Sequence, residues 1–477
     1  MNRLTLPFRA AWRWADERAG LAKAFGPLVT HRVPRPVAHG RSAWLYIFGG
    51  ATLTAFLLQV VTGVILATAY VPSTASAYDS LQFITHDATF GRILRGMHYF
   101  GASAMVILIA AHMVRVFLTG SFKFPRELNW LTGVLLFFLT LGMAFTGQLL
   151  RWDEDAVGSV FVAAEQAGRV PLVGNGLAHF ILAGENIGAA TLSRFFALHV
   201  FILPGLIFAV VGFHLFLVLH NGISEPPSAG EAVDRASYRR RYEEMVRRAG
   251  SAYFPWAFWR EALVGLVLVG IIFLLALVFG PKALNGPPDP TNTQANPRPD
   301  WYLLWIFALL AVAPVRLEDW LIVLGPLVTI VVLVAVPFVA HSGERHLSRR
   351  PWAAGIVLGA LVSIAGLLYI GYRSPWAPRF DTRPLAAEQL ETTNPDVING
   401  AGQFYALGCQ YCHTVNGHGG IRGPNLTNVV DRLSDADLRA TILTGRTNMP
   451  SYSNTITEEQ LAAILAFLHS VNGSRPP

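Results

Sequence analysis

Two stretches decide how this chain folds: residues 97–118, MHYFGASAMVILIAAHMVRVFL, and residues 198–219, LHVFILPGLIFAVVGFHLFLVL. Each is long and apolar enough for a helix that crosses a bilayer, which takes about 20 residues. Each also carries two histidines, and an imidazole inside a membrane helix is costly unless it has a partner. The two stretches therefore predict membrane helices that hold a buried group between them.

The spacing of these histidines indicates what that group is. His98 and His112 are 14 residues apart, and His199 and His214 are 15 apart. Either step is close to four helical turns, so the two histidines of each helix face roughly the same side of it. They are about 21 Å apart along the helix axis. If the two helices run in the same direction, His98 meets His199 at one level. His112 then meets His214 at the other. A lone buried histidine is more often a hydrogen-bonded structural residue, but four at matched depth favour two haems b, each held by two histidines.

Glycines on the neighbouring apolar stretches repeat the same step. Gly49 and Gly63 are 14 residues apart, as are Gly133 and Gly147. A glycine lets a flat macrocycle approach the backbone at each haem level. Glycine is also common where membrane helices pack, so the spacing adds to the histidine pattern and does not replace it.

Two arginines bracket the histidines on the first of these helices. Arg95 and Arg115 could pair with haem propionates, because a guanidinium binds a carboxylate through two parallel hydrogen bonds. For Arg115 the alternative is a cytoplasmic anchor of the membrane helix.

The whole chain is composed like a membrane protein of several spans. Of its 477 residues 53% are hydrophobic and 14% are charged, against about a quarter charged in soluble domains. Seven stretches are long enough to cross: roughly 43–70, 93–118, 129–150, 195–219, 259–280, 318–341 and 352–372. Residues 1–26 have no signal-peptide core; they resemble an amphipathic surface helix, with a disordered tail as the alternative.

The net charge of +7 is distributed as in membrane proteins and does not indicate nucleic-acid binding. With the N-terminus in the cytoplasm, the cytoplasmic segments hold 21 Lys and Arg and the exterior loops hold 5. This is the positive-inside asymmetry. The cytoplasmic segments are 1–41, 115–128, 221–260 and 341–351, and the exterior loops are 71–91, 151–191 and 281–317. Seven crossings then leave the C-terminus outside.

The C-terminal part contains both cysteines of the chain, in Cys409-Gln410-Tyr411-Cys412-His413. This C-x-x-C-H pattern is typical of covalent haem c attachment, with the histidine as an iron ligand. Met449 is the predicted sixth ligand, since Met/His ligation is typical of cytochromes c. His418 and His469 are fallback ligands, each more simply a surface histidine. Haem c is attached outside the cytoplasm, the side that the charges predict for this end.

We therefore expect an all-α fold, with seven membrane helices and a small all-α cytochrome c domain. Ser434 and Thr457 are expected to begin helices in that domain as N-caps. The expected divisions are an N-terminal surface segment, a four-helix di-haem domain, a cytoplasmic linker, a three-helix domain, a second linker and the cytochrome c domain: 1–41, 42–225, 226–258, 259–375, 376–395 and 396–477.

Over about residues 40–375 the sequence resembles the cytochrome b family of bc-type quinol oxidoreductases. The resemblance is carried by LYIFGGATLTAFLLQVVTG, HMVRVFLTGSFKFPRELNWLTGVLL and TLSRFFALHVFILP. Up to residue 225 it is most similar to the chloroplast type, whose second histidine step is also 15. Residues 259–375 are similar to that system's separate three-helix subunit, and the C-terminal part resembles a class I cytochrome c.

A second family motif stands at Pro299-Asp300-Trp301-Tyr302. It resembles the P-E-W-Y of the outer quinol-oxidation site, so the resemblance implies that Asp300 accepts a proton from quinol. Trp301, Tyr302 and Pro299 would shape the pocket. Without the resemblance, a Pro-Asp turn that begins a helix is the simpler interpretation.

Three positions bear on how far the family pattern extends. Ile47 replaces the cysteine to which the chloroplast type attaches an extra haem, so a covalent bond is impossible there. Arg151-Trp152-Asp153 replaces the family's P-W-D. His220, near the cytoplasmic end of its helix, is only suggestive of the inner quinone site.

The resemblance implies a quinol:cytochrome c oxidoreductase subunit in a bacterial-type plasma membrane, with the cytochrome c domain on the periplasmic side. Quinol would be oxidised outside, electrons would cross through the b haems and leave through the c haem, and protons would be translocated. Its partners would be a Rieske iron–sulfur protein, a second copy of the chain and a downstream electron acceptor. The alternative is a membrane-anchored multihaem carrier that serves a dehydrogenase.

Overall fold

The computed structural model describes the following residues: Asp16, Arg18, 30–184, 186–288, 298–374, 382–390, 392–420, 423–445, 449, 451–453 and 455–471. The expected surface helix at residues 1–26 lies outside these residues, apart from Asp16 and Arg18. The chain forms two compact units, which are considered separately. The first is Met1–Asp289, Pro297–Leu303 and Pro314–Ala365, and the second is Pro290–Asn296, Leu304–Ala313 and Gly366–Pro477.

The fold is all-α, as predicted. Within the described residues, sheet is limited to two short antiparallel pairs, β1 (Arg32–Val33) with β2 (Ser251–Ala252) and β3 (Thr414–Val415) with β4 (His418–Gly419). The described part of the chain has seven helical segments that could cross a membrane by length and composition, which confirms the seven expected spans. They are Arg41–Ala67, Gly91–Leu118, Glu127–Leu149, Ala189–Asn221, Trp256–Val278, Leu317–Val339 and Pro351–Arg373.

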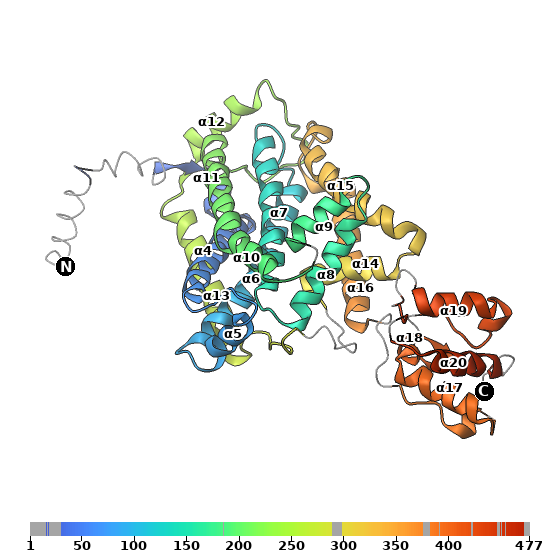
Figure 1. Cartoon of the computed structure of the whole chain (residues 1–477). Coiled ribbons are helices and arrows are strands. Elements are labelled where there is room, and N and C mark those ends of the chain that lie inside the picture. Colours follow the sequence, from blue (N-terminus) through green and yellow to red (C-terminus); the bar gives the residue numbers. More distant parts are fainter. Residues whose placement is uncertain are drawn as a thin grey trace. The chain divides into compact units, whose positions relative to one another are not determined.

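The first five spans form a bundle in which neighbouring helices pair. α4 (Phe48–Ala67) packs along α6 (Gly91–Leu118), and α7 (Glu127–Leu149) packs along α11 (Leu203–Asn221) (Figure 1). α13 (Trp256–Val278) lies against both α4 and α6. Small residues bring helices together, as membrane packing requires: a Cβ on Gly96 would lie 2.9 Å from that of Ala276.

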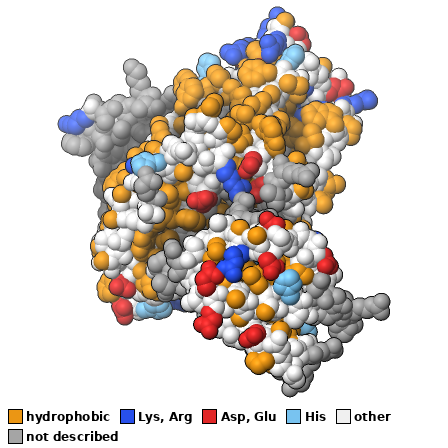
Figure 2. All heavy atoms as spheres, turned by 45° about the vertical axis from the view of Figure 1, so that its right-hand side comes forward, with side chains coloured by type: hydrophobic (Ala, Val, Ile, Leu, Met, Phe, Trp, Pro, Cys, Tyr) orange, Lys and Arg blue, Asp and Glu red, His pale blue; other side chains and the backbone are white. Residues whose placement is uncertain are grey.

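The surface of the spans is apolar. Leu266 is 70% exposed and Val278 is 66% exposed, and many other large hydrophobic side chains are similarly open. Figure 2 shows broad areas of hydrophobic side chains on the face in view. Lipid is as apolar as these side chains, so a membrane helix keeps them on its outside without cost.

The segments between the spans are more structured than the sequence predicted. The regions treated as exterior loops contain α5 (Ala77–His86), α8 (Glu154–Gly168), α9 (Gly174–Leu182) and α14 (Trp301–Val312). Asp153 is the N-cap residue of α8, and its carboxylate accepts a 2.9 Å hydrogen bond from the backbone N–H of Ala156. These helices are short and interrupted by turns, so hydropathy over a membrane-length window does not reveal them.

The remaining elements of this part lie within the spans or in the segments beside them. They are α3 (Arg35–Ala38), η1 (Arg41–Tyr46), α10 (Ala189–Ala197), η2 (Leu198–Ile202), α12 (Tyr238–Ala249), α15 (Val315–Val339), η3 (Leu347–Arg349) and α16 (Pro351–Arg373).

The C-terminal part contains η4 (Ala387–Leu390), α17 (Pro395–Ala406), α18 (Cys409–Cys412), η5 (Val429–Asp431), α19 (Asp435–Thr444) and α20 (Glu458–Ser470). α17 packs along α20, and the rings of Phe404 and Phe467 meet at a tilt of 52° within their shared core, with a centroid distance of 5.4 Å. Ser434 and Thr457 cap α19 and α20, as predicted, each in a reciprocal capping box.

Arg126 joins the linker helix α12 to the bundle. It is buried, donates 2.8 Å hydrogen bonds to the Gly222 carbonyl and the Tyr238 hydroxyl, and lies 5.0 Å from the centre of the Tyr242 ring. Tyr238 and Tyr242 both belong to α12. This guanidinium therefore contributes to holding the start of α12 against the end of α11, together with the hydrogen bond that the Tyr242 hydroxyl donates to the Ile223 carbonyl.

We expect Arg126→Ala to release α12. Hydrogen bonds to a charged group contribute about 1.5–3 kcal/mol each, so trypsin should cleave the arginine-rich linker at least roughly tenfold faster. The measurement is a time course of limited proteolysis. Arg349→Ala removes an exposed arginine that pairs loosely with Glu344 and should leave the rate unchanged; equal rates in the two variants would contradict the role given to Arg126.

Candidate functional site

The structure brings His98 and His199 together. Their ring centroids are 6.2 Å apart, and the rings are inclined at 80°. Metal–imidazole bonds of about 2 Å on either side, plus roughly 1.1 Å from each nitrogen to its ring centre, give about 6 Å. The pair therefore fits two ligands on opposite sides of one metal ion.

The histidine side chains are oriented through their Nδ1 atoms. A threonine hydroxyl lies within hydrogen-bond distance of Nδ1 in three of them: Thr62 with His98 at 3.0 Å, Thr146 with His199 at 3.2 Å and Thr132 with His214 at 2.7 Å. In His199, Nδ1 also lies 3.1 Å from the carbonyl oxygen of Met143, which can only accept. The proton is thus on Nδ1, and Nε2 is left with the lone pair that a metal needs.

Each of the four glycines faces one of the four histidine rings. An added Cβ would lie close to the Cε1 atom of the facing ring: Gly147 2.5 Å from His199, Gly63 3.1 Å from His98, Gly49 3.4 Å from His112 and Gly133 3.9 Å from His214. The glycines therefore make room for the imidazole rings of the neighbouring helix. The sequence had indicated only that these glycines make room for a haem macrocycle.

A π-helical turn accounts for the longer step between His199 and His214. The span Ala189–Asn221 is α-helical except at Leu198–Ile202, which is π-helical and contains His199. At 3.6 residues per turn, 14 residues fall just short of four turns and 15 pass beyond them. The wide turn takes up about one residue, so His199 and His214 keep nearly the angular relation that His98 and His112 have.

The three threonines are site residues that the sequence reasoning missed. The signal was present: Thr62, Thr132 and Thr146 each stand directly before one of the spaced glycines. The glycine opens the space for the ring, and the preceding hydroxyl reaches its Nδ1. At the fourth position, Phe48 precedes Gly49.

The two candidate propionate partners differ. Arg95 donates to the Thr85 hydroxyl at 2.9 Å and to the Lys282 carbonyl at 3.0 Å. Arg115 lies 3.8 Å from the centre of the Tyr46 ring, and its Nε and Nη2 are buried with no hydrogen-bond partner among the described residues. Buried donors are normally paired, so Arg115 has free capacity for an anionic group.

A cavity of about 260 Å³ runs from the first histidine pair to the P-D-W-Y motif. His98, His199 and Arg95 line one part of it, and Asp300 and Tyr302 line another. Pro299 is buried, and the indole N–H of Trp301 donates to the Ser103 hydroxyl at 3.1 Å. α14 begins at Trp301, so the motif is also the helix-starting turn that the sequence allowed.

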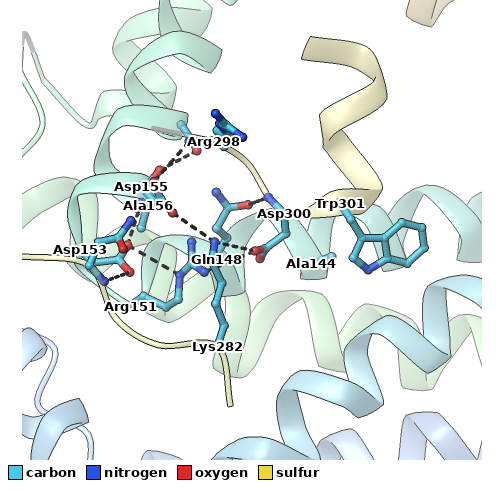
Figure 3. Close-up of polar contacts among 12 residues, drawn as sticks. Ala144, Gln148, Arg151, Asp153, Asp155, Ala156, Lys282, Arg298, Asp300 and Trp301 are labelled. Carbon is cyan, nitrogen blue, oxygen red and sulfur yellow. Dashed lines mark hydrogen bonds and ion pairs between the residues drawn. The ribbon is translucent and has the colours of Figure 1, made fainter. Parts of the chain in front are cut away.

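Asp300 lies within a cluster of charged and polar groups (Figure 3). Its Oδ1 is 3.3 Å from Nη1 of Arg151 and 3.4 Å from Nζ of Lys282, and its Oδ2 accepts from the Tyr302 hydroxyl at 3.1 Å. Its backbone N–H donates to the side-chain oxygen of Gln148 at 3.2 Å. The acid is therefore held in one orientation by contacts on both oxygens.

The same cluster shifts the pKa of two neighbours. Burial alone would lower the pKa of Arg151, but the carboxylates of Asp300 and Asp153 outweigh it and raise that pKa overall. Burial, followed by the charge of Asp300, raises the pKa of Tyr302 well above its ordinary value. Arg151 is thus a permanent cation and Tyr302 a neutral hydroxyl donor.

His220, which was suggestive of the inner quinone site, lies at the end of α11. Its side chain is exposed and stacks on the Phe216 ring at 6.0 Å between centroids. Ile47 precedes α4 as its N-cap residue.

In the C-terminal part, Cys409 and Cys412 form the single turn α18, and His413 follows directly. Nδ1 of His413 lies 2.9 Å from the carbonyl oxygen of Pro424, so it donates there and leaves Nε2 for a metal. Burial raises the pKa of the Cys409 thiol to about 12 and lowers that of His413. The donor set fits a covalently attached haem.

The structure also describes the other candidate iron ligands of this part, Met449, His418 and His469. Met449 is half-buried, while its neighbours in the predicted loop lie outside the described residues. His418 is exposed, and His469 pairs with Asp435 at 2.7 Å on the surface. Neither histidine is placed like a ligand.

The chain matches three family models. Residues 35–222 match cytochrome b/b6/petB, 287–385 match cytochrome b(C-terminal)/b6/petD, and 396–468 match cytochrome C oxidase, cbb3-type, subunit III. The two cytochrome b models thus match the part of the chain with the membrane spans, and the third model matches the C-terminal part.

Two relatives each cover just under half of the chain. It is 42% identical over 217 residues to the menaquinol:cytochrome c reductase cytochrome b subunit of Bacillus subtilis (strain 168), which covers 45% of this chain and 96% of the relative. It is 41% identical over 214 residues to cytochrome b6 of Heliobacterium mobile, covering 45% and 99%. A solved structure titled hyperthermophilic respiratory Complex III matches with a TM-score of 0.63 and 23% identity, over 84% of this chain and 96% of that one, and shows the fold.

The histidine-bearing helix bundle and these matches define a membrane-embedded haem protein of electron transport. The chain belongs to the cytochrome b/b6 family, with a C-terminal cytochrome b domain and a cytochrome c domain of the cbb3 subunit III type. These domains imply haem b and haem c.

We expect Gly147→Ala to displace the ring of His199. Overpacking of this kind costs about 1–3 kcal/mol, and the displaced ligand should lower the haem b content to roughly half. The measurement is the reduced-minus-oxidised absorbance of the purified protein. Gly212→Ala is the matched control, because an added Cβ there meets nothing within 4 Å; equal haem content in both variants would contradict the contact.

Proposed function

We propose that this chain is the cytochrome b/c subunit of a quinol:cytochrome c oxidoreductase that oxidises quinol at an outer site. The observation that carries the proposal is the cavity that His98 and His199 share with Asp300 and Tyr302. A histidine pair and a carboxylate on one largely apolar pocket support the binding and oxidation of a lipid-soluble quinol there. The similarity to the menaquinol:cytochrome c reductase cytochrome b subunit of Bacillus subtilis supports the same activity.

In this proposal the two histidine pairs hold two haems b. His98 with His199 forms the site nearer the outer face, and His112 with His214 forms the inner one. Arg95 and Arg115 lie at the two levels to meet propionates. When bound, haem supplies one-electron acceptor and donor chemistry at two depths of the membrane.

The C-terminal domain holds one haem c through thioether bonds from Cys409 and Cys412. His413 and Met449 would bind its iron, and the haem would supply one-electron transfer there. The Nδ1 contact with Pro424 holds the His413 ring in place.

At the quinol end, Asp300 is the proposed base. Oxidation of quinol to quinone releases two protons and two electrons, and the Asp300 carboxylate takes a proton from a quinol hydroxyl. Tyr302, Trp301 and Pro299 shape the pocket. A Rieske iron–sulfur protein would take one electron, and the haems that the histidine pairs would hold would supply the acceptor for the other.

The proposed setting is a bacterial-type plasma membrane, with the N-terminus in the cytoplasm and the cytochrome c domain outside. The excess of Lys and Arg on the proposed cytoplasmic side supports this orientation. Splitting the two electrons couples the reaction to proton translocation. The proposed assembly is a homodimer with the Rieske protein and a downstream electron acceptor.

The test is the quinol:cytochrome c reductase activity of the purified complex with menaquinol and ubiquinol analogues. We expect Asp300→Asn to lower turnover by roughly 100-fold, the scale of a lost general base, with haem content unchanged. Asp319→Asn is the control, because Asp319 is a mostly exposed acid paired with Arg169. Failure to oxidise any of these quinols, together with the absence of a Rieske EPR signal, would favour the carrier alternative.

A further inference from the structure

Arg151 occupies the position at which the family motif has proline. Its Nη1 lies 3.3 Å from Oδ1 of Asp300, which itself replaces the family's longer glutamate. Both side chains are nearly buried, with 11% and 12% of their surface exposed. The two departures from the family pattern therefore meet in one ion pair.

Arg151 has more donors than this pair uses. Its Nε and Nη2 are buried without a hydrogen-bond partner among the described residues, and so is Nε2 of Gln148. Gln148 is only 4% exposed, and its other side-chain atom, Oε1, already accepts from the Asp300 N–H. Both side chains line the cavity that Asp300 and Tyr302 also line.

The neighbouring acids do not account for these free donors. Asp153 caps α8 and lies 3.7 Å from Nε of Arg151, beyond hydrogen-bond distance. Asp155 accepts from Lys282 at 3.1 Å and from the Arg298 N–H. A buried donor is normally satisfied by protein, water or ligand, so these donors on the cavity lining can still bind a hydrogen-bond acceptor.

We propose that Arg151 and Gln148 bind the quinol oxygen as it becomes anionic. The inference rests on the proposed quinol site and names the groups that stabilise the charge formed there. In the step, a quinol O–H bond breaks, its proton goes to the Asp300 carboxylate, and the quinol oxygen keeps the electron pair. Arg151 and Gln148 donate hydrogen bonds to that oxygen.

Charge explains why an arginine is suited to this position. Protonation removes the negative charge of Asp300 when the quinol oxygen gains one. The guanidinium of Arg151 is therefore next to one anion throughout, first the Asp300 carboxylate and then the quinol oxygen. A guanidinium stays charged throughout. Donors aimed at a developing anion in a site that excludes water are a strong source of catalysis.

The first test compares Arg151→Gln and Arg151→Lys in the purified complex, with menadiol as substrate. We expect Arg151→Gln to lower kcat by about 100-fold, the scale of a lost oxyanion donor, with a smaller change in KM. Arg151→Lys keeps the charge and should lower kcat less than tenfold. Arg169→Gln is the control, because Arg169 pairs with Glu318 at 2.9 Å outside this cavity.

A second test separates binding from a structural effect. The probes are 2-hydroxy-1,4-naphthoquinone, which is an anion at neutral pH, and its neutral 2-methoxy analogue. Arg151→Gln should weaken inhibition by the hydroxy compound at least tenfold and leave the methoxy compound nearly unchanged. Arg151→Lys should keep most of the preference for the anion. If Arg151→Gln loses its haem b absorbance, the inhibition of Arg151→Lys by the two probes is the measurement that tests the inference.

The outcomes distinguish this inference from the proposed function. If Asp300→Asn abolishes turnover while Arg151→Gln and its probe preference match the wild type, the inference is overturned and the quinol site stands. If neither substitution affects quinol oxidation, the proposed site itself fails. Equal loss of the preference for the anion in Arg151→Lys and Arg151→Gln would overturn the role given to charge.

Discussion

An imidazole in the interior of a membrane helix must have a partner, and this constraint organises the structure. Water cannot satisfy it there, so each ring needs a hydrogen bond on one nitrogen and a ligand for the other. His98, His199 and His214 have the first from threonine hydroxyls. The facing glycines then set how closely the helices approach, and so the packing of the bundle depends on the histidine sites.

Much of this arrangement could be predicted from the sequence. The seven spans follow from hydropathy alone, and two steps of about four turns place four histidines at two levels. The cytochrome c motif and the caps at Ser434 and Thr457 are local patterns, which the chain carries in a few consecutive residues. Such features are predictable because each depends on its own segment.

The features that could not be predicted depend on contacts between segments. The π-helical turn at Leu198–Ile202 inserts one residue without any local signal beyond the proline at 204. The short helices α5, α8, α9 and α14 have too few apolar residues to reach membrane length. Arg151 and Asp300 form a pair although they are 149 positions apart in the sequence. In the sequence they are two separate departures from the family pattern, and nothing there indicates that they are in contact.

The pair of Arg151 and Asp300 also shows how charged neighbours can hold the carboxylate of a side chain that is shorter than glutamate. Aspartate reaches one methylene less far than glutamate, but here Arg151, Lys282 and Tyr302 all contact its carboxylate. A cluster with both signs of charge holds the group in a fixed position without leaving a buried charge alone. The proposed quinol site then combines a positioned aspartate with a cation.

The most direct test of the central claim is the haem stoichiometry of the purified protein by pyridine haemochrome spectra. The histidine sites predict two haems b and one haem c per chain. His98→Leu and His112→Leu should each reduce haem b while haem c is kept. Full haem b absorbance in either variant would contradict the account, because the two histidine pairs would then not be the iron ligands.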